Sequence, residues 1–246
     1  NYVEEYEAGN YPTDATLVQA LENLKALVEQ IEAGMKELTD QIDALFAPIM
    51  TLSDEETEQS VYEAKKAQID ALVKALSESV YNKIIDAEYG KKLADAQLAY
   101  QTADALIVEV QEAIDGAVIE ASLKDVADVE ALYKSLAELK VFGSEGYTSK
   151  LEETTAEAFF GVNLTSEVDR TSLDEKEVAF VQAIIDSISS PIKYEQVGLI
   201  EKARAEYDML SEANQAKIVG MEEKLEAAET DIENYKTLAA EATAKI

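Results

Sequence analysis

A single stripe of apolar residues runs through residues 17–45, which read LVQALENLKALVEQIEAGMKELTDQIDAL. The stripe advances by alternating steps of four and three residues, which keeps its side chains on one face of an α-helix. Its members are Leu17, Leu21, Leu24, Val28, Ile31, Met35, Leu38, Ile42 and Leu45. Such a stripe is a coiled-coil seam, and it predicts a helix about 50 Å long that Pro48 ends.

Outward from this seam, the same spacing predicts further long helices. Ser53 and Glu56 form a capping box that opens a second helix, and Gly90 is expected to end it. The apolar positions of the second helix are Val61, Ile69, Leu72, Leu76, Val80 and Ile84. A third helix is expected from Leu93 to Gly116. The chain has only nine Gly and three Pro, so the predicted fold class is all-α.

The second half of the chain contains an internal repeat, because a shift of about 74 residues aligns two stretches without a gap. The coinciding positions include Ile107 with Val181, Ile114 with Ile188, Val126 with Ile200, Tyr133 with Tyr207, Leu136 with Leu210 and Leu151 with Leu225. Each copy is expected to contain three helices separated by two short breaks. In the earlier copy, Ser122 and Asp125 start the middle helix, and the stretch 143–146 precedes the third.

The later copy has its own predicted helix starts. Ser190 is expected to cap the middle helix with Pro191 at the first helical position, and Ser211 is expected to open the third. Upstream, Ser172 and Glu175 are expected to cap the first helix.

These patterns predict tandem three-helix bundles, spectrin-like and packed as coiled coils, with long helices. The expected parts are an N-terminal extension at 1–12, a first bundle at 13–103, a second at 104–160, a linker or elaboration at 161–176, and a third bundle at 177–246 whose last helix is truncated. A helix shared between the first two bundles would make a stiff rod.

The amino-acid composition argues against several classes of function. Lys and Arg number 21 against 51 Asp and Glu, a net charge of -30 that repels a nucleic-acid backbone. The chain has no Cys and no His, which removes thiolate nucleophiles, the usual general base and most ligands of zinc and haem. A membrane-spanning helix needs about 20 consecutive apolar residues, and no apolar run in the sequence approaches that length. The sequence therefore predicts a soluble, non-catalytic chain without a cofactor, and any export signal is expected to have been removed.

The last repeat resembles a helical module found in tandem in large secreted and wall-attached proteins of Gram-positive bacteria, including S-layer-like proteins. The matching residues are IEKARAEYDML at 200–210, QAKIV at 215–219 and LEAAE at 225–229. The module's usual Gln-Lys pair is here separated by Ala216. The resemblance covers about 55 residues well and the first hundred hardly at all. It implies an extracellular spacer or lattice module on the cell surface or cell wall, with no catalytic residues to carry over.

Several groups of residues are candidates for binding. Acidic clusters such as Asp54–Glu56, Asp125 with Asp128 and Glu130, and Glu222 with Glu223 suggest weakly bound calcium as a hypothesis, although no EF-hand loop is present. Solvated helix faces explain the same clusters. Tyr133 and Tyr207 could stack on a ligand, but their seam positions favour core packing.

A candidate interaction patch of Phe159, Phe160, Val162 and Leu164 lies where the helical pattern breaks. Two functions then fit the sequence. The first is a structural rod or lattice segment that contacts copies of itself or cell-wall components. The second is an adhesin that recognises a protein or polysaccharide through an exposed patch. An intracellular coiled-coil scaffold also fits the seams, but not the resemblance to surface proteins.

Overall fold

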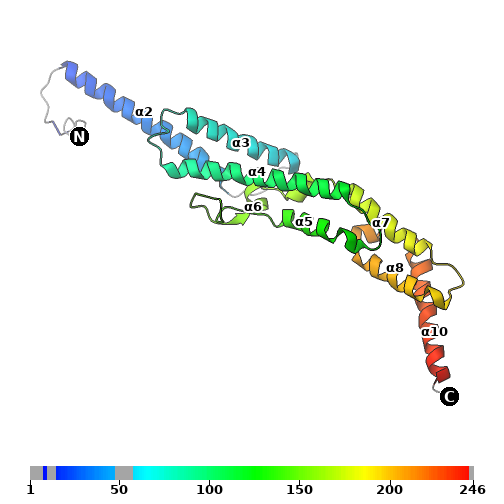
Figure 1. Cartoon of the computed structure of the whole chain (residues 1–246). Helices are drawn as coiled ribbons and strands as arrows, with labels where there is room; N and C mark the ends of the chain where they lie inside the picture. The colour runs from blue at the N-terminus through cyan, green and yellow to red at the C-terminus, as the bar shows by residue number, and fades with distance from the viewer. Residues whose placement is uncertain (1–7, 10–14, 48–57, 244–246) are drawn as a thin grey trace. The chain divides into compact units, whose positions relative to one another are not determined.

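The computed structural model describes residues 8–9, 15–47 and 58–243, with only the backbone described for 58–60, Glu222 and Ala242. The described residues are predominantly helical, which confirms the all-α prediction (Figure 1). Their packing divides the chain into two compact units. Unit 1 contains residues 1–105 and 137–166, and unit 2 contains residues 106–136 and 167–246. The expected second bundle, 104–160, is therefore shared between the two units.

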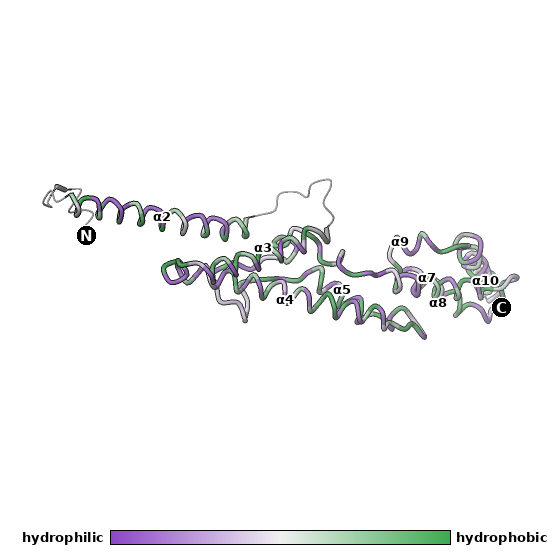
Figure 2. Tube along the Cα trace, turned by 90° about the horizontal axis from the view of Figure 1, so that it is seen from above, coloured by the Kyte–Doolittle hydropathy of each residue, from purple (hydrophilic) through white to green (hydrophobic). Residues whose placement is uncertain are grey.

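Three helices form the frame of unit 1: α2 (Ala15–Leu45), α3 (Glu58–Glu78) and the first part of α4 (Ala87–Gly116). Helix α2 confirms the predicted seam helix, and its hydrophilic and hydrophobic residues alternate along its length (Figure 2). Its buried residues are Leu38, Ile42 and Leu45. The expected signals at Pro48, Ser53 and Glu56 lie outside the described residues.

The second predicted helix ends earlier than expected. Helix α3 stops before Val80, and both Val80 and Ile84 are exposed rather than part of a seam. The next helix, α4, begins at Ala87, and the carboxylate of the preceding Asp86 accepts the backbone N–H of Glu88 at 2.9 Å. Gly90 lies inside α4 and does not end a helix, whereas the predicted end of α4 at Gly116 is confirmed. This hydrogen bond makes Asp86 the N-cap of α4, which explains why the helix boundary lies before Gly90.

Residues 138–166 differ from the expected third helix of the 104–160 bundle. Two short strands, β1 (Lys140–Val141) and β2 (Thr154–Thr155), pair antiparallel, with Lys140 opposite Thr155. A five-residue helix, α6 (Ala156–Phe160), and a 3-10 helix, η2 (Leu164–Glu167), follow.

Backbone geometry explains why this segment is not a long helix. Phe142, Gly143 and Gly146 have positive φ angles, which an α-helix of L-residues does not allow. A Cβ atom at Gly143 would lie 2.7 Å from the backbone nitrogen of Glu153, so the close approach of the two chain segments requires glycine there.

Unit 2 combines the rest of α4 with a series of shorter elements. They are η1 (Leu123–Val126), α5 (Ala127–Ala137), α7 (Thr171–Asp186), η3 (Tyr194–Gln196), α8 (Val197–Met209), α9 (Glu212–Gln215), the π-helix η4 (Met221–Glu226) and α10 (Ala227–Thr243). Helices α7, α8, η4 and α10 pack around one core. The fully buried members of that core include Val181, Ile185, Ile200, Ala203, Leu225 and Ala228.

The predicted helix starts of unit 2 are confirmed in part. Ser122 and Asp125 start a helical segment as predicted, because they form a capping box at the beginning of η1. Ser190 and Pro191 instead lie in the loop before η3, which begins at Tyr194. Ser211 does cap a helix, but that helix is the four-residue α9 and not the long helix that follows. Similarly, α7 begins one residue before Ser172, so that serine lies inside it.

Candidate functional site

The predicted interaction patch lies in the core of unit 1. Phe159, Phe160, Val162 and Leu164 are all buried, so they offer no exposed surface in this structure. Helix α6 follows β2 directly, and its residues Ala156, Phe159 and Phe160 are buried. Thr155 caps α6 by accepting the N–H of Ala158 at 3.1 Å.

Aromatic rings from distant parts of the chain surround the two phenylalanines. The ring of Phe160 meets that of Tyr62 on α3 edge to face, with 5.0 Å between centroids. The ring of Phe159 lies 4.8 Å from Phe142 and 5.7 Å from Phe46. Such pairs stabilise a core beyond the area they bury. The sequence alone suggests an interaction patch at residues 159–164 because these aromatic partners lie far away along the chain.

A buried lysine lies beside this aromatic cluster. The Nζ of Lys65 donates to the backbone carbonyl of Leu45, the last residue of α2, and lies 5.0 Å from the centroid of Phe159. Burial lowers the pKa of Lys65 to about 8. The ammonium occupies the C-terminal end of α2, where helix carbonyls lack partners within the helix. Its role in this geometry is to join α3 to α2.

A buried carboxylate performs a similar task on α4. Asp95 accepts the backbone N–H groups of Thr148 and Ser149 at 2.9 Å and 2.7 Å, and both hydroxyls of these residues also donate to it. Desolvation acts to raise the pKa of Asp95, but the hydrogen bonds from Ser149 and Thr148 outweigh it and lower the pKa. Asp95 thereby fixes the loop between β1 and β2 on α4.

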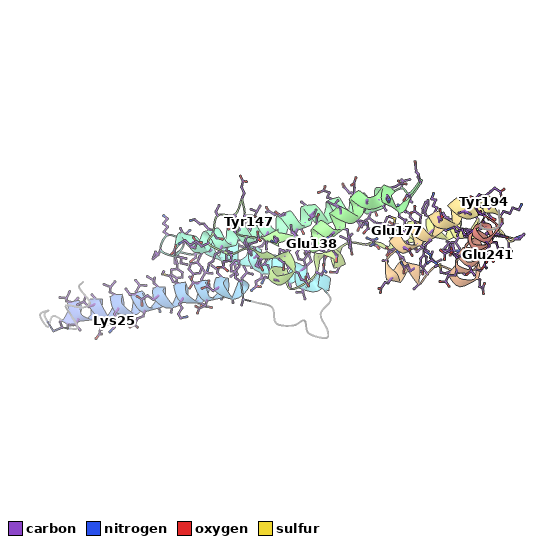
Figure 3. All side chains as sticks on the ribbon, turned by 90° about the horizontal axis from the view of Figure 1, so that it is seen from below. Lys25, Glu138, Tyr147, Glu177, Tyr194 and Glu241 are labelled. Atoms are coloured by element: carbon purple, nitrogen blue, oxygen red, sulfur yellow. The ribbon has the colours of Figure 1, made fainter. Side chains whose placement is uncertain are left out.

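Unit 2 contains a connected polar network centred on Arg170. The guanidinium donates to both carboxylate oxygens of Glu130 on α5, at 2.8 Å and 2.5 Å, and to Glu177 on α7 at 3.2 Å. Asn214 on α9 donates to the other oxygen of Glu177 at 2.9 Å. Burial raises the pKa of Glu177 (labelled in Figure 3), and the charge of Arg170 opposes that shift. The network links three helices through side chains.

The two seam tyrosines each stack against an arginine. The guanidinium of Arg170 lies 5.2 Å from the ring centroid of Tyr133, and that of Arg204 lies 5.6 Å from the ring of Tyr207. Arg204 also donates two hydrogen bonds of 2.7 Å to Glu229 on α10. Both rings are half-buried, so they pack within unit 2 rather than stand ready to stack on a ligand.

The acidic residues do not form a visible cation site in the described part of the chain. No group of three or more Asp, Glu, His or Cys is placed to hold a metal among the described residues. The carboxylate of Asp125 accepts backbone N–H groups of residues 120–122, which lowers its pKa, and Glu130 is held by Arg170. Asp54–Glu56 and the side chain of Glu222 lie outside the description. Calcium binding stays a prediction.

An open hollow of about 810 Å³ lies in unit 2 between the segment 192–197, which includes η3, and the middle of α10. Its lining residues are Ile192, Lys193, Tyr194, Glu195, Val197, Ile232, Tyr235, Lys236 and Ala239. Tyr194 is 82% exposed and lies at the surface of unit 2 (Figure 3). We refer to this hollow as the tyrosine groove. Its apolar floor, two tyrosine rings and two ammonium groups are the features of a ligand-binding surface.

The sequence alone does not predict the tyrosine groove. The available signal is Tyr194 itself, three residues after Pro191, an aromatic residue that is not among the apolar positions shared by the two copies of the repeat. The partner ring, Tyr235, is on α10, and only the fold brings it near.

No helix in the described part of the chain combines the length and the apolar character that crossing a membrane requires. Comparison with protein-family models, with curated proteins and with solved structures finds no match for this chain.

Proposed function

We propose that this chain is a non-catalytic structural segment of an extracellular bacterial surface protein, acting as a rod-like spacer or an S-layer-like lattice module. The observation that carries the proposal is how the buried charged groups are used. Lys65, Asp95 and Glu177 each join separate elements of their own unit, and none of them lines the tyrosine groove. Perturbed ionisable groups at an active site would instead face a cavity.

The repeat supports a tandem-bundle organisation within this proposal. Three pairs of matched residues are buried in both copies: Ile114 with Ile188, Val126 with Ile200, and Leu136 with Leu210. In the later copy, α7 and α8 pack with η4 and α10 as a three-helix bundle would. In the earlier copy, the segment that follows α5 contains β1, β2 and α6 rather than a long third helix. Two copies of one helical module in tandem are consistent with a chain whose role is structural.

Location and partners in the proposal follow from the resemblance and from the charge. Surface-protein modules of the kind that residues 200–229 resemble lie outside the cell, attached to the wall. A net charge of -30 favours contacts that cations bridge, so self-association or contact with cell-wall components is the proposed interaction. Antibodies against the chain should then label intact cells of the source organism without permeabilisation, and labelling only after lysis would reject the location.

Small-angle X-ray scattering tests the rod. A compact chain of this length has a radius of gyration of about 18 Å, and a rod-like spacer must clearly exceed that value. A measured value near the compact one would reject the spacer function. For the lattice function, sedimentation velocity with millimolar calcium should show larger assemblies than sodium chloride of matched ionic strength does.

A second function, ligand recognition by an adhesin, is favoured by the tyrosine groove. If it is correct, Tyr194→Ala with Tyr235→Ala should abolish binding on a glycan and peptide array. Val219→Ala, which changes an exposed apolar residue outside the groove, is the matched control. An array with no binder for the unaltered chain would remove this alternative.

A further inference from the structure

Two helix ends flank the turn at residues 117–122, and the later copy of the repeat supplies a charged side chain for each of them. Helix α4 ends before this turn, and η1 begins after it. The last carbonyls of a helix and its first N–H groups have no partners within the helix. A lysine on α7 binds the end of α4, and a glutamate on α8 binds the beginning of η1. These contacts all lie within unit 2.

Lys176 on α7 binds the end of α4. Its Nζ donates to the backbone carbonyls of Asp115 and Ala117, at 3.2 Å and 2.8 Å. A cation at the C-terminal end of a helix satisfies these carbonyls and also interacts favourably with the helix dipole. Lys176 therefore completes hydrogen bonds that α4 cannot make by itself.

Glu206 on α8 binds the beginning of η1. Its side chain is only 5% exposed, and one carboxylate oxygen accepts the backbone N–H of Leu123 at 2.7 Å. The side chain of Leu123 is equally buried and belongs to the core that α7, α8 and α10 share. A buried carboxylate without a hydrogen bond is costly, so Glu206 and Leu123 each satisfy a group of the other.

The turn supplies partners for its neighbouring N–H groups without help from the later copy. The carboxylate of Asp125 accepts the three N–H groups of residues 120–122. Ser122 accepts the N–H of Lys124 through its hydroxyl and that of Asp125 through its carbonyl. The N–H of Leu123 lies between these groups and donates to the later copy instead. The turn is therefore complete only when the later copy is in place.

The corresponding turn of the later copy is closed by its own residues. Val197, which the shift of 74 residues aligns with Leu123, donates its N–H to the carbonyl of Tyr194. The residues of the earlier copy that align with Lys176 and Glu206 are Thr102 and Leu132, neither of which carries a charge. The pair of charged contacts is thus a property of this junction and not of every copy of the repeat.

We propose that Lys176 and Glu206 form a clamp that fixes the turn at residues 117–122 on the later copy, so that unit 2 behaves as one rigid body. Gln111 on α4 and Asp169 before α7 support the same arrangement by exchanging hydrogen bonds of 3.2 Å and 2.8 Å. The clamp goes beyond the proposed spacer role, because a fixed joint between two modules would serve a lattice segment or an adhesin equally well.

Hydrogen exchange of the full chain, followed by NMR, tests the clamp. In Lys176→Met with Glu206→Leu, the Leu123 amide should exchange at least about tenfold faster, because its N–H loses the acceptor. The amides of Val181 and Ile185 in the α7 core should keep their rates. Both substitutions retain helix propensity, so circular dichroism should not change. Glu206→Gln keeps an acceptor oxygen at this position and should leave the Leu123 amide slow.

The matched control removes a similar pair of charges elsewhere in the later copy. Glu201→Leu with Lys236→Met eliminates an exposed ion pair of 4.0 Å between α8 and α10. The exchange rate of the Leu123 amide should be unchanged in this control. An equal acceleration there would mean that the loss of any charge pair loosens the turn, and it would overturn the clamp.

Distances between spin labels test the rigidity directly. The chain has no cysteine, so a single pair of labels can be introduced by Ala131→Cys on α5 and Ala179→Cys on α7, two exposed positions in unit 2. Pulsed electron resonance should give one narrow distance distribution for the otherwise unaltered chain. The Lys176→Met, Glu206→Leu chain should lose this single distance and give a broad distribution, and Glu206→Gln should retain it.

These outcomes separate the clamp from the proposed function. A broad distribution in the unaltered chain overturns the clamp without any variant, even if scattering shows a rod. Equal acceleration at Leu123, Val181 and Ile185 also overturns it, because Lys176 and Glu206 would then only stabilise the core. A narrow distribution in a chain with a compact radius of gyration retains the clamp and rejects the spacer.

Discussion

Replacing Phe160 with alanine should destabilise unit 1 strongly. Phe160 is completely buried, and its ring meets both Tyr62 and Phe159. The matched control is Tyr194→Ala, which removes a ring of similar size from a side chain 82% exposed in unit 2.

The expected loss follows from the burial and the ring contacts. A Phe→Ala change in a core costs about 3–5 kcal/mol, because the removed ring loses its transfer energy and leaves a cavity. The two edge contacts of Phe160, at 5.0 Å and 4.9 Å between centroids, favour the upper part of that range. Tyr194→Ala should change stability by no more than about 0.5 kcal/mol.

Native-state hydrogen exchange measured by mass spectrometry identifies the unit that loses stability. In Phe160→Ala, the most protected amides of residues 58–105 should exchange about 10²- to 10⁴-fold faster, since each 1.4 kcal/mol is a factor of ten. Peptides from α7 and α8 should change little. If Phe160→Ala behaves like Tyr194→Ala, residues 159–164 are not core, and the argument for an exposed patch returns.

Three further outcomes are expected from the buried ionisable groups. Burial lowers the pKa of Lys65 to about 8, so between this pH and the ordinary lysine pKa of 10.5 the unfolded chain binds more protons than the folded chain does. The free energy of unfolding should therefore rise with pH across this window, and urea unfolding of Lys65→Met should lack the rise. Burial raises the pKa of Glu177, so the folded chain holds this proton more tightly than the unfolded chain, and stability should fall as pH rises above 4.5. The melting temperature of Glu177→Gln should fall less steeply with pH, and an unchanged dependence on pH would contradict the raised pKa. The lowered pKa of Asp95 stabilises the fold above pH 3.8, and this stability is lost as the pH falls below 3.8. Asp95→Asn should therefore cost about 1.5–3 kcal/mol at neutral pH and accelerate hydrogen exchange of the Ser149 amide, and unchanged exchange of that amide would show that Asp95 does not hold the loop.

The helices could be predicted where a long periodic stripe defined them. The alternation from Leu17 to Leu45 identified α2, and the seam ending at Gly116 identified the end of α4. The capping box of Ser122 and Asp125 located a helix start because its two hydrogen bonds are local in sequence. Signals that act within one helical turn are therefore readable without a structure.

Features that depend on distant residues could not be read in this way. A third helix is expected after residues 143–146, but the positive φ angles at Phe142 and Gly143 and the pairing of β1 with β2 give this segment a different structure. The burial of Phe160 required Tyr62, about a hundred residues earlier in the chain. The tyrosine groove required Tyr194 and Tyr235 to approach through the packing of α10.

The interleaved connectivity of the two units has a consequence for biosynthesis. The polypeptide leaves unit 1 after residue 105, returns to it at residue 137 and leaves again after residue 166. A ribosome therefore delivers part of unit 2 before the phenylalanines that complete the first core. Until residue 160 has emerged, Phe46 and Tyr62 lack the rings they finally pack against. Vectorial folding from the N-terminus cannot finish one unit before the other begins, and a nascent chain halted near residue 105 should be the form that recruits chaperones.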